Sequence, residues 1–419
     1  MHTLPPICIL WDASHIWGLM AWRALHAVGL NCRLTQCREI AQGILDKGGV
    51  RLLVVPGGNA RQKAQALGGA GMTAIQDFVK QGGGYLGFCG GAGLALHAKE
   101  TLSLCPWSRK PYPDRLQHLI SGHVLANVTD NDFCPSTLKG KTLALPVWWP
   151  GQFREEMDPR VHVLAKAKEK AQDFWLGDLP LSSIPERIVS LWHAEYGLDL
   201  SSNFLCDKAL VVEGLYGKGR YVLSYSHLET PQSPDANNLL AHILTQMTQI
   251  PLPQTILPAW ILESPSVWES NAFVEPLLKA RYVIKTLIAL ALEHHLFFER
   301  TSWLYGWASG IPGAMLNSLH AAIVTLLSIP PSPKALSYFA EVREHFTRIL
   351  PIFAAAAEES LLTSRITSVL GHVLPHGIRQ KDRTNRQEAI FGSPIHGGGL
   401  LGSLLGILEE MLYLSQENR

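Results

Sequence analysis

The chain has 419 residues, of which 47% are hydrophobic and 17% are charged, and its formal net charge is +1. This composition excludes a generally disordered chain, and the charge gives no electrostatic basis for binding nucleic acid. Because the length exceeds that of one average domain, we expect two domains.

The first hundred residues alternate between strand and helix patterns. Buried strands are predicted at 7–11, 31–40, 50–55 and 85–89, and helices at 14–29, 72–84 and from 90 onward. In the first helix, Ser14 is a plausible N-cap. Strand and helix in alternation predict an α/β fold, a three-layer sandwich with a mostly parallel sheet covered on both faces.

The signals are weaker in the middle of the chain. Strands are predicted in "TLALPVWWPGQF" and "RVHVLAKAK", and "KALVVEGLYGKGRYVLSYSHLE" is typical of a hairpin that leads to a last strand. The tryptophans of "VWWPG" could line a pocket or pack in the core. Three prolines in "QIPLPQTILPAW" predict a linker at 251–262, which separates a domain at 1–250 from one at 263–419.

Beyond the linker the pattern is helical and favours an all-α bundle of unknown role. Residues 272–305 form one long amphipathic region, and further helices are predicted to follow it. The polar stretch 379–399 is predicted to be a mobile loop. The apolar stretches are shorter than the roughly 18 residues that span a bilayer, so we expect no membrane span. The low charge of these helices leaves open burial against a protein partner or a second copy of the chain.

The stretch "GGGYLGFCGGAGLAL" places Cys89 between a predicted strand and a predicted helix, with glycines on both sides. Only small neighbours allow a side chain to be presented on so tight a turn, and a helix N-terminus favours a thiolate. Cys89 is therefore a candidate nucleophile. The alternative is a buried cysteine that packs as a small hydrophobic residue.

A candidate base follows in "SYSHLETP". His227 and Glu229 lie two residues apart, and two is the period at which side chains of a strand share a face. Glu229 could orient the imidazole of His227, which could in turn address Cys89, as in a catalytic triad. The amide of Gly90 could hold an oxyanion, and that of Gly57 or Gly58 in "PGGN" could be the second donor. The alternatives are a surface pair and a plain turn.

The seven cysteines contain no CxxC or paired zinc spacing, and the histidines have no acidic partners at ligand spacing. His294 and His295 are adjacent, so a helix directs their side chains apart, while His372, His376 and His396 lie near predicted loops. We therefore expect a reduced, cytoplasmic protein with no metal and no cofactor.

The motifs "PGG", "YLGFCGGAG" and "GKGRYVLSYSHLE", in this order, resemble the class I glutamine amidotransferase superfamily, and most closely a domain of the biotin-protein ligase N-terminal type. The resemblance covers roughly residues 5–250. It implies a flavodoxin-like fold, with Cys89 as nucleophile, His227 as base and Glu229 as orienting acid. Leu228 stands where the superfamily usually has proline. The glycine-rich biotin-binding loop of a ligase catalytic domain has no counterpart here.

Two functions from different classes follow. The first is a cysteine-dependent amidohydrolase or amidotransferase-like enzyme, which acts on a small amide or acyl substrate through a Cys-His-Glu triad. The second is a catalytically silent scaffold of the same fold, which binds a protein partner or a small ligand through its cleft and its helical domain. A third function is that of a carrier or sensor that uses the cleft above the sheet.

Overall fold

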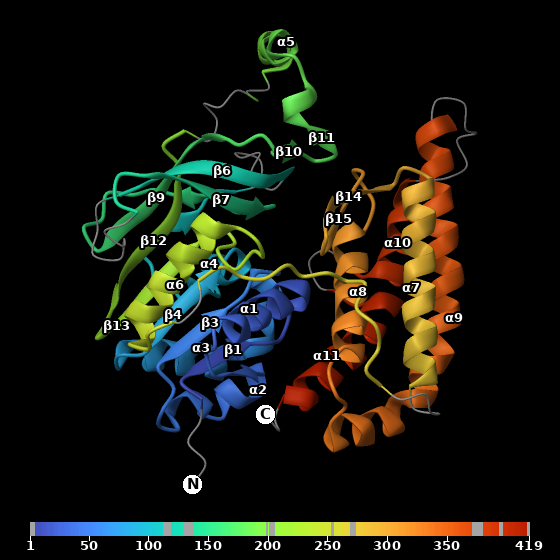
Figure 1. Cartoon of the computed structure of the whole chain (residues 1–419), viewed down its shortest axis with the longest axis horizontal. Helices are drawn as coiled ribbons and strands as arrows, with labels where there is room; N and C mark the ends of the chain where they lie inside the picture. The colour runs from blue at the N-terminus through green and yellow to red at the C-terminus, as the bar shows by residue number, and fades with distance from the viewer. Residues whose placement is uncertain are drawn as a thin grey trace. The chain divides into compact units, whose positions relative to one another are not determined.

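The computed structural model describes residues 5–111, 119–129, 138–197, 200, 206–252, 255–268, 274–370, 380–393 and 397–416. The chain forms two compact units, Met1–Ala259 and Trp260–Arg419. The first combines a large sheet with helices, and the second consists mainly of helices (Figure 1).

The first unit contains one 11-stranded sheet and one small two-stranded sheet within the described residues. The strands of the large sheet are β1 (Ile7–Leu10), β2 (Cys32–Thr35), β3 (Leu52–Val55), β4 (Gly84–Phe88), β6 (Ile120–Val128), β7 (Thr142–Trp148), β9 (Val161–Lys170), β10 (Trp175–Leu176), β11 (Leu179–Pro180), β12 (Ala209–Tyr216) and β13 (Gly219–Ser224). The small sheet pairs β5 (Ser108–Arg109) with β8 (Phe153–Arg154). The helices are α1 (His15–Ala27), α2 (Cys37–Ala41), α3 (Ala60–Lys80), α4 (Gly90–Ala95), α5 (Glu186–Tyr196) and α6 (Pro234–Thr248), with short 3₁₀ turns at Ile44–Asp46 and Leu181–Ser183.

The parallel part of the sheet runs in the order β2-β1-β3-β4-β13. Its strands are short, apolar and almost wholly buried, as expected for a sheet covered on both faces. Leu53, Val55 and Tyr85 face the side on which α2, α3 and α4 pack. On the other face, α6 reaches the start of β4, where Met247 borders Gly84, and α1 packs against β1 and β2. The predicted α/β sandwich with a mostly parallel sheet is thus confirmed (Figure 1).

Beyond β13 the sheet continues with antiparallel strands. The sequence pattern predicted β7, β9 and the β12–β13 hairpin, but it predicted neither β6 nor the pairing of these strands into the same sheet. The order is β13-β12-β9-β6-β7, and the β10–β11 hairpin joins the start of β6. Strand β7 pairs with β6 alone among the described strands and therefore forms an edge. Pro146 lies within β7, opposite His123 of β6. An edge strand can accommodate proline because one of its sides needs no ladder hydrogen bonds.

Two predicted elements of the first unit were wrong in extent. The predicted strand 31–40 ends at Thr35, because Gln36 and Glu39 form a capping box that starts α2. The helix predicted from residue 72 begins at Ala60, because the side chain of Asn59 accepts hydrogen bonds from the first free amides. The sequence pattern missed this start since Gly68 interrupts the helix with a non-helical backbone.

The second unit contains α7 (Glu275–Glu293), β14 (Phe297–Thr301), β15 (Leu304–Trp307), α8 (Gly313–Leu327), α9 (Pro333–Leu370), α10 (Gln380–Phe391) and α11 (Gly399–Gln416). The predicted helical C-terminal region is confirmed. None of the helices within the described residues is both long and apolar enough to cross a membrane.

Two expectations for this unit were wrong. The long helix expected over 272–305 stops at Glu293, and a hairpin follows, because the Asn317 side chain bonds both the amide and the carbonyl of Tyr305 and fixes the second strand. The aromatic and β-branched residues of this hairpin also favour a strand. The stretch expected to be a mobile loop contains α10.

Candidate active site

Cys89 occupies the turn between β4 and α4, with φ 44° and ψ −99°. Such angles are strained for any residue other than glycine, so the surrounding contacts must hold them. The amide of Cys89 donates to the carbonyl of Ser224 at 2.7 Å, and its carbonyl accepts from Gly93 at 2.9 Å. The side chain is half-buried. The thiol is thus presented at the carboxyl ends of β4 and β13.

Glycine is required at the two positions that follow Cys89 because other backbone segments lie against them. A Cβ atom at Gly90 would lie 1.9 Å from the carbonyl oxygen of Gly58, and one at Gly91 would lie 2.0 Å from that of Val55. No side chain fits at either position. The packing holds the Cys89 turn directly against the loop that follows β3.

Three amides near Cys89 are available to a ligand. Within the described part of the chain, the N–H groups of Gly57, Gly58 and Gly90 donate to no protein acceptor. The helix that follows Cys89 has only six residues. Electrostatic stabilisation of an anion at this point therefore depends on these individual N–H groups more than on a long helix dipole.

His227 and Glu229 form a buried pair. Nδ1 of His227 lies 2.7 Å from Oε1 of Glu229, and the two side chains are 0% and 1% exposed. The imidazole also borders the loop after β3, since its Cε1 would lie 2.9 Å from a Cβ atom at Gly57. The half-buried Trp17 stacks on the ring, with centroids 4.3 Å apart at 28°. The fold thus brings His227, Glu229 and the free amide of Gly57 together.

The environment of His227 favours its protonated form. Burial lowers the pKa of the imidazole, but the charge of Glu229 and a hydrogen-bonding contact with Cys89 outweigh burial and raise the pKa to about 10. Nδ1 is engaged by Glu229, so Nε2 is the nitrogen available to Cys89. Nε2 is buried and forms no hydrogen bond of standard geometry among the described residues.

The segment that carries His227 is held by residues from distant parts of the chain. The amide of His227 donates to the carbonyl of Pro146 at 2.9 Å. The side-chain amide of Asn237 donates to the carbonyls of Leu228 and Thr230, and its oxygen accepts from the amide of Leu257. These contacts were not predicted, because no local signal in the sequence links residues 146 and 237 to the histidine.

Aromatic side chains form one wall of the site. The indole of Trp148 donates to the hydroxyl of Thr230 at 3.1 Å, and Thr230 donates to the carbonyl of His227. Trp149 lies edge-on to Trp17, with ring centroids 6.5 Å apart. Trp148 is buried and Trp149 half-buried. Of the two alternatives for "VWWPG", core packing thus holds for Trp148, while Trp149 lies beside Trp17.

A buried lysine supports the loop that precedes α1. Lys63 is 0% exposed, and its ammonium donates to the hydroxyl of Ser14 and to the carbonyl of Asp12. The carbonyl of Ala13 would lie 2.3 Å from a Cβ atom at Gly58, so this loop backs the free amides. Ser14 is the N-cap residue of α1, as expected, but its hydroxyl donates to the carbonyl of Leu10 and makes no capping bond. Lys63 was missed because α3 was predicted to start later.

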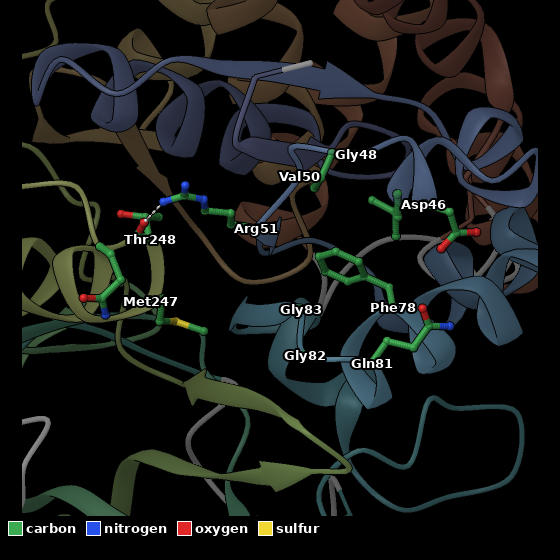
Figure 2. Close-up of a pocket in the computed structure, with 12 residues that line it drawn as sticks. Asp46, Gly48, Val50, Arg51, Phe78, Gln81, Gly82, Gly83, Met247 and Thr248 are labelled. Atoms are coloured by element: carbon green, nitrogen blue, oxygen red, sulfur yellow. Dashed lines mark hydrogen bonds between the residues drawn. The ribbon is translucent and has the colours of Figure 1, made fainter. Parts of the chain in front are cut away.

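A separate cavity of about 590 Å³ lies at the opposite edge of the sheet, beside the residues that precede β3 and β4. Figure 2 shows Arg51 at this cavity, where it donates to the carbonyl of Thr248 at 2.8 Å. None of the residues predicted for the site lines it. Within the described residues, no three histidine, cysteine or acidic side chains are placed to hold a metal ion. His372, His376 and His396 lie outside the described residues.

Comparison with protein families finds one match within the first unit. Residues 47–100 match the family described as "Biotin-protein ligase, N terminal". The matched segment contains β3, α3, β4 and the Cys89 turn, and it ends before His227 and Glu229. The resemblance stated from the motifs is thus confirmed over these residues. No curated protein matches the chain.

Several solved structures align with part of the chain. PurLQS from Thermotoga maritima has 15% identity and a TM-score of 0.40, over 58% of this chain and 99% of that one. A Thermoplasma acidophilum protein described as a GMP synthase subunit has 11% identity and a TM-score of 0.38, over 59% and 96%. A β-galactosidase from Bacillus circulans has 11% identity and a TM-score of 0.34, over 59% and 32%. Alignments at this level assign no activity to the chain.

Proposed function

We propose that this chain, whose residues 47–100 match the biotin-protein ligase N-terminal family, is a cysteine-dependent amidohydrolase of the amidotransferase-like type. Its substrate is a small amide or acyl compound, and Cys89, His227 and Glu229 carry the reaction. One observation supports this most strongly. A strained cysteine turn, free amides and a buried His–Glu pair meet at the carboxyl ends of neighbouring strands, although they come from separate parts of the chain.

The raised pKa of His227 sets the order of proton transfers. At neutral pH the imidazole is protonated, and the nucleophile is the sulfur of Cys89 in its thiolate form. The sulfur attacks the amide carbonyl carbon and a C–S bond forms. The carbonyl oxygen takes the electron pair and is held by the amides of Gly57, Gly58 and Gly90. His227 then gives its proton to the departing nitrogen, the C–N bond breaks, and a thioester remains.

Water resolves the thioester. The neutral imidazole takes a proton from the attacking water, and the C–S bond breaks to release the acid and the thiolate. His227 ends protonated, as it began. Glu229 holds the ring in one orientation and stabilises its charge throughout. Trp17 stacks on one face of the ring, and the sulfur of Cys89 is half-buried.

A chloroketone analogue of glutamine tests this proposal, together with a panel of amides whose acyl adducts are sought by mass spectrometry. We expect a covalent adduct on Cys89 and a loss of turnover of about 10³-fold or more in Cys89→Ala. Cys206 is the matched control, because it is also a free, half-buried cysteine. Equal labelling of Cys206, or turnover that persists in Cys89→Ala, would exclude the proposal.

A second candidate, a binding scaffold, is favoured by the surface of α9. Four large apolar side chains of this helix are exposed: Ile352, Leu362, Ile366 and Val369. Three of them follow the i, i+4, i+7 spacing of one helix face. Such a stripe is complementary to itself, so a second copy of the chain is the occupant that fits it.

Light scattering of the full chain tests self-association through α9. Ile366→Glu should convert a dimer into a monomer, whereas Ser368→Glu, on the other side of the helix, should not. A monomeric wild-type chain that turns over an amide would remove this candidate and leave the first.

A further inference from the structure

Three side chains of the first unit form a second nucleophile, base and acid arrangement that involves neither Cys89 nor His227. Nε2 of His123 lies 3.0 Å from the hydroxyl of Ser233, and Nδ1 of His123 lies 2.8 Å from Oδ2 of Asp173. The residues come from β6, the segment between β9 and β10, and the residue before α6. Their order in space is that of a serine, histidine and aspartate triad.

Asp173 fixes the imidazole of His123 at two points. Its second oxygen, Oδ1, accepts the backbone amide of His123 at 3.0 Å. The ring and the backbone of one residue are thus held by one carboxylate. With Nδ1 donating to this carboxylate, Nε2 carries the lone pair and accepts from the hydroxyl of Ser233. This is the arrangement required of a general base.

Ser233 is placed like a nucleophile rather than like a helix cap. It directly precedes α6, a helix of 15 residues with Pro234 in its first turn, yet its hydroxyl makes no capping bond and is directed to His123. The residue before it, Gln232, has a φ of 54°, which is a strained value for a non-glycine residue. Within the described residues, the amides of Asp235 and Ala236 donate to no protein acceptor, so an oxyanion formed at Ser233 has two donors nearby.

The arrangement lies just beneath the surface. Ser233 is 3% exposed, while its neighbours Gln232 and Pro234 are exposed. The side chains of His123 and Asp173 are 26% and 42% exposed. His123 and Asp173 therefore reach the surface, whereas Ser233 is buried. The limited access restricts the chemistry to small substrates.

We propose that Ser233, His123 and Asp173 form a second catalytic site, which hydrolyses small carboxylic esters. The Ser233 oxygen attacks the ester carbonyl carbon and its proton passes to Nε2 of His123. The C–O bond to the alcohol breaks, and the alcohol leaves with that proton. Water then attacks the acyl-serine, gives a proton to His123, and releases the acid as the Ser233 oxygen regains the proton.

This site is distinct in chemistry from the one at Cys89, although the two lie on neighbouring backbone. His123 pairs across the ladder with Pro146, whose carbonyl accepts the amide of His227. The nucleophiles are an alcohol and a thiol. A fluorophosphonate reacts with activated serines and therefore tests the Ser233 site, whereas an iodoacetamide blocks the thiol of Cys89. The two reagents can therefore show that one proposal fails while the other holds.

The test is labelling of the full chain by a fluorophosphonate probe, with the site read by mass spectrometry. In this reaction the Ser233 oxygen bonds to phosphorus, fluoride leaves with its electron pair, and His123 takes the proton. We expect one adduct, on Ser233, in both the wild type and Cys89→Ala. His123→Gln removes the base and should slow labelling about 100-fold or more. Asp173→Asn should slow it as well, because the ring loses its orientation.

Hydrolysis of p-nitrophenyl acetate by the Cys89→Ala chain gives the second readout. Of the two proposed nucleophiles, this variant retains only Ser233. It should turn over the ester and lose this activity with Ser233→Ala. Ser183→Ala is the matched control, because Ser183 is exposed and its hydroxyl bonds only the carbonyl of Pro180. Absence of an adduct on Ser233 in the folded wild type overturns the proposal. An unchanged labelling rate in folded His123→Gln also overturns it. The hydrogen bond between His123 and Ser233 would then only connect β6 to the start of α6.

Discussion

At the scale of single residues, His227 combines full burial with a raised pKa. The folded chain binds this proton up to a pH of about 10, whereas an unfolded histidine releases it near its ordinary pKa of 6.5. The stabilisation by this proton is therefore complete below pH 6.5 and is lost as the pH rises toward 10. It depends on Glu229, whose charge supports the imidazolium.

Glu229→Gln should consequently flatten the pH dependence of stability. We expect the unfolding midpoint of the wild type to fall more steeply between pH 7 and pH 10 than that of the variant, as measured by circular dichroism during heating. Groups other than His227 and Glu229 contribute equally to the pH dependence of both chains, so their contribution cancels when the two unfolding midpoints are subtracted. Parallel curves would mean that His227 does not hold its proton in the folded chain.

Gly90 tests the packing of the Cys89 turn. A methyl group at this position would overlap the carbonyl of Gly58, so Gly90→Ala should destabilise the chain by about 1–3 kcal/mol or more and displace Cys89. Gly69→Ala is the control, because Gly69 lies on the exposed side of α3 with open space around it. Gly69→Ala should stabilise the folded chain by about 0.5–1 kcal/mol. Urea denaturation measures both, and equal effects would refute the packing argument.

At the scale of elements, the turn from His227 to Thr230 depends on α6. Asn237 of this helix satisfies two carbonyls of the turn and one amide of the chain beyond it. Asn237→Ala leaves these buried groups without partners, at a cost of about 1–3 kcal/mol. Because His227 then loses its fixed position, chloroketone labelling of Cys89 should slow by roughly 10- to 100-fold. Asn238 is the next residue of the helix and is half-buried, so Asn238→Ala should change neither the stability nor the labelling rate. Slow labelling of Cys89 in this variant would contradict the role assigned to Asn237.

The elements also show which parts of the structure were predictable. The parallel strands were accessible from sequence because short apolar runs and glycine turns are local signals. The strand, turn and helix around Cys89 were accessible for the same reason. The pairing of the antiparallel strands β7 and β9 with β6 was not, since contacts between distant segments determine it. The interruption at Gly68 hid the true start of α3, and the contacts of Asn317 that fix the β14–β15 hairpin could not be read from a stretch with helical periodicity.

For the whole molecule, the division into two units has a direct experimental consequence. Each residue proposed for the Cys89 site belongs to Met1–Ala259. A chain that ends at Ala259 should therefore fold and react with the chloroketone at the rate of the full chain. Circular dichroism establishes the folding, and mass spectrometry establishes the rate. A folded fragment with an unreactive Cys89 would assign a role in the reaction to Trp260–Arg419.

Pro146 in β7 is also part of an edge at which the sheet could aggregate with another chain. Along this outermost strand, the carbonyl of Pro146 is taken by the amide of His227 and by the hydroxyl of Ser226. The turn that carries the imidazole therefore shields a strand edge to which another chain could otherwise add. Substitutions that detach this turn from β7 should therefore cause aggregation and also slow the chloroketone labelling of Cys89. Precipitation and slower labelling would then both report that the turn has detached.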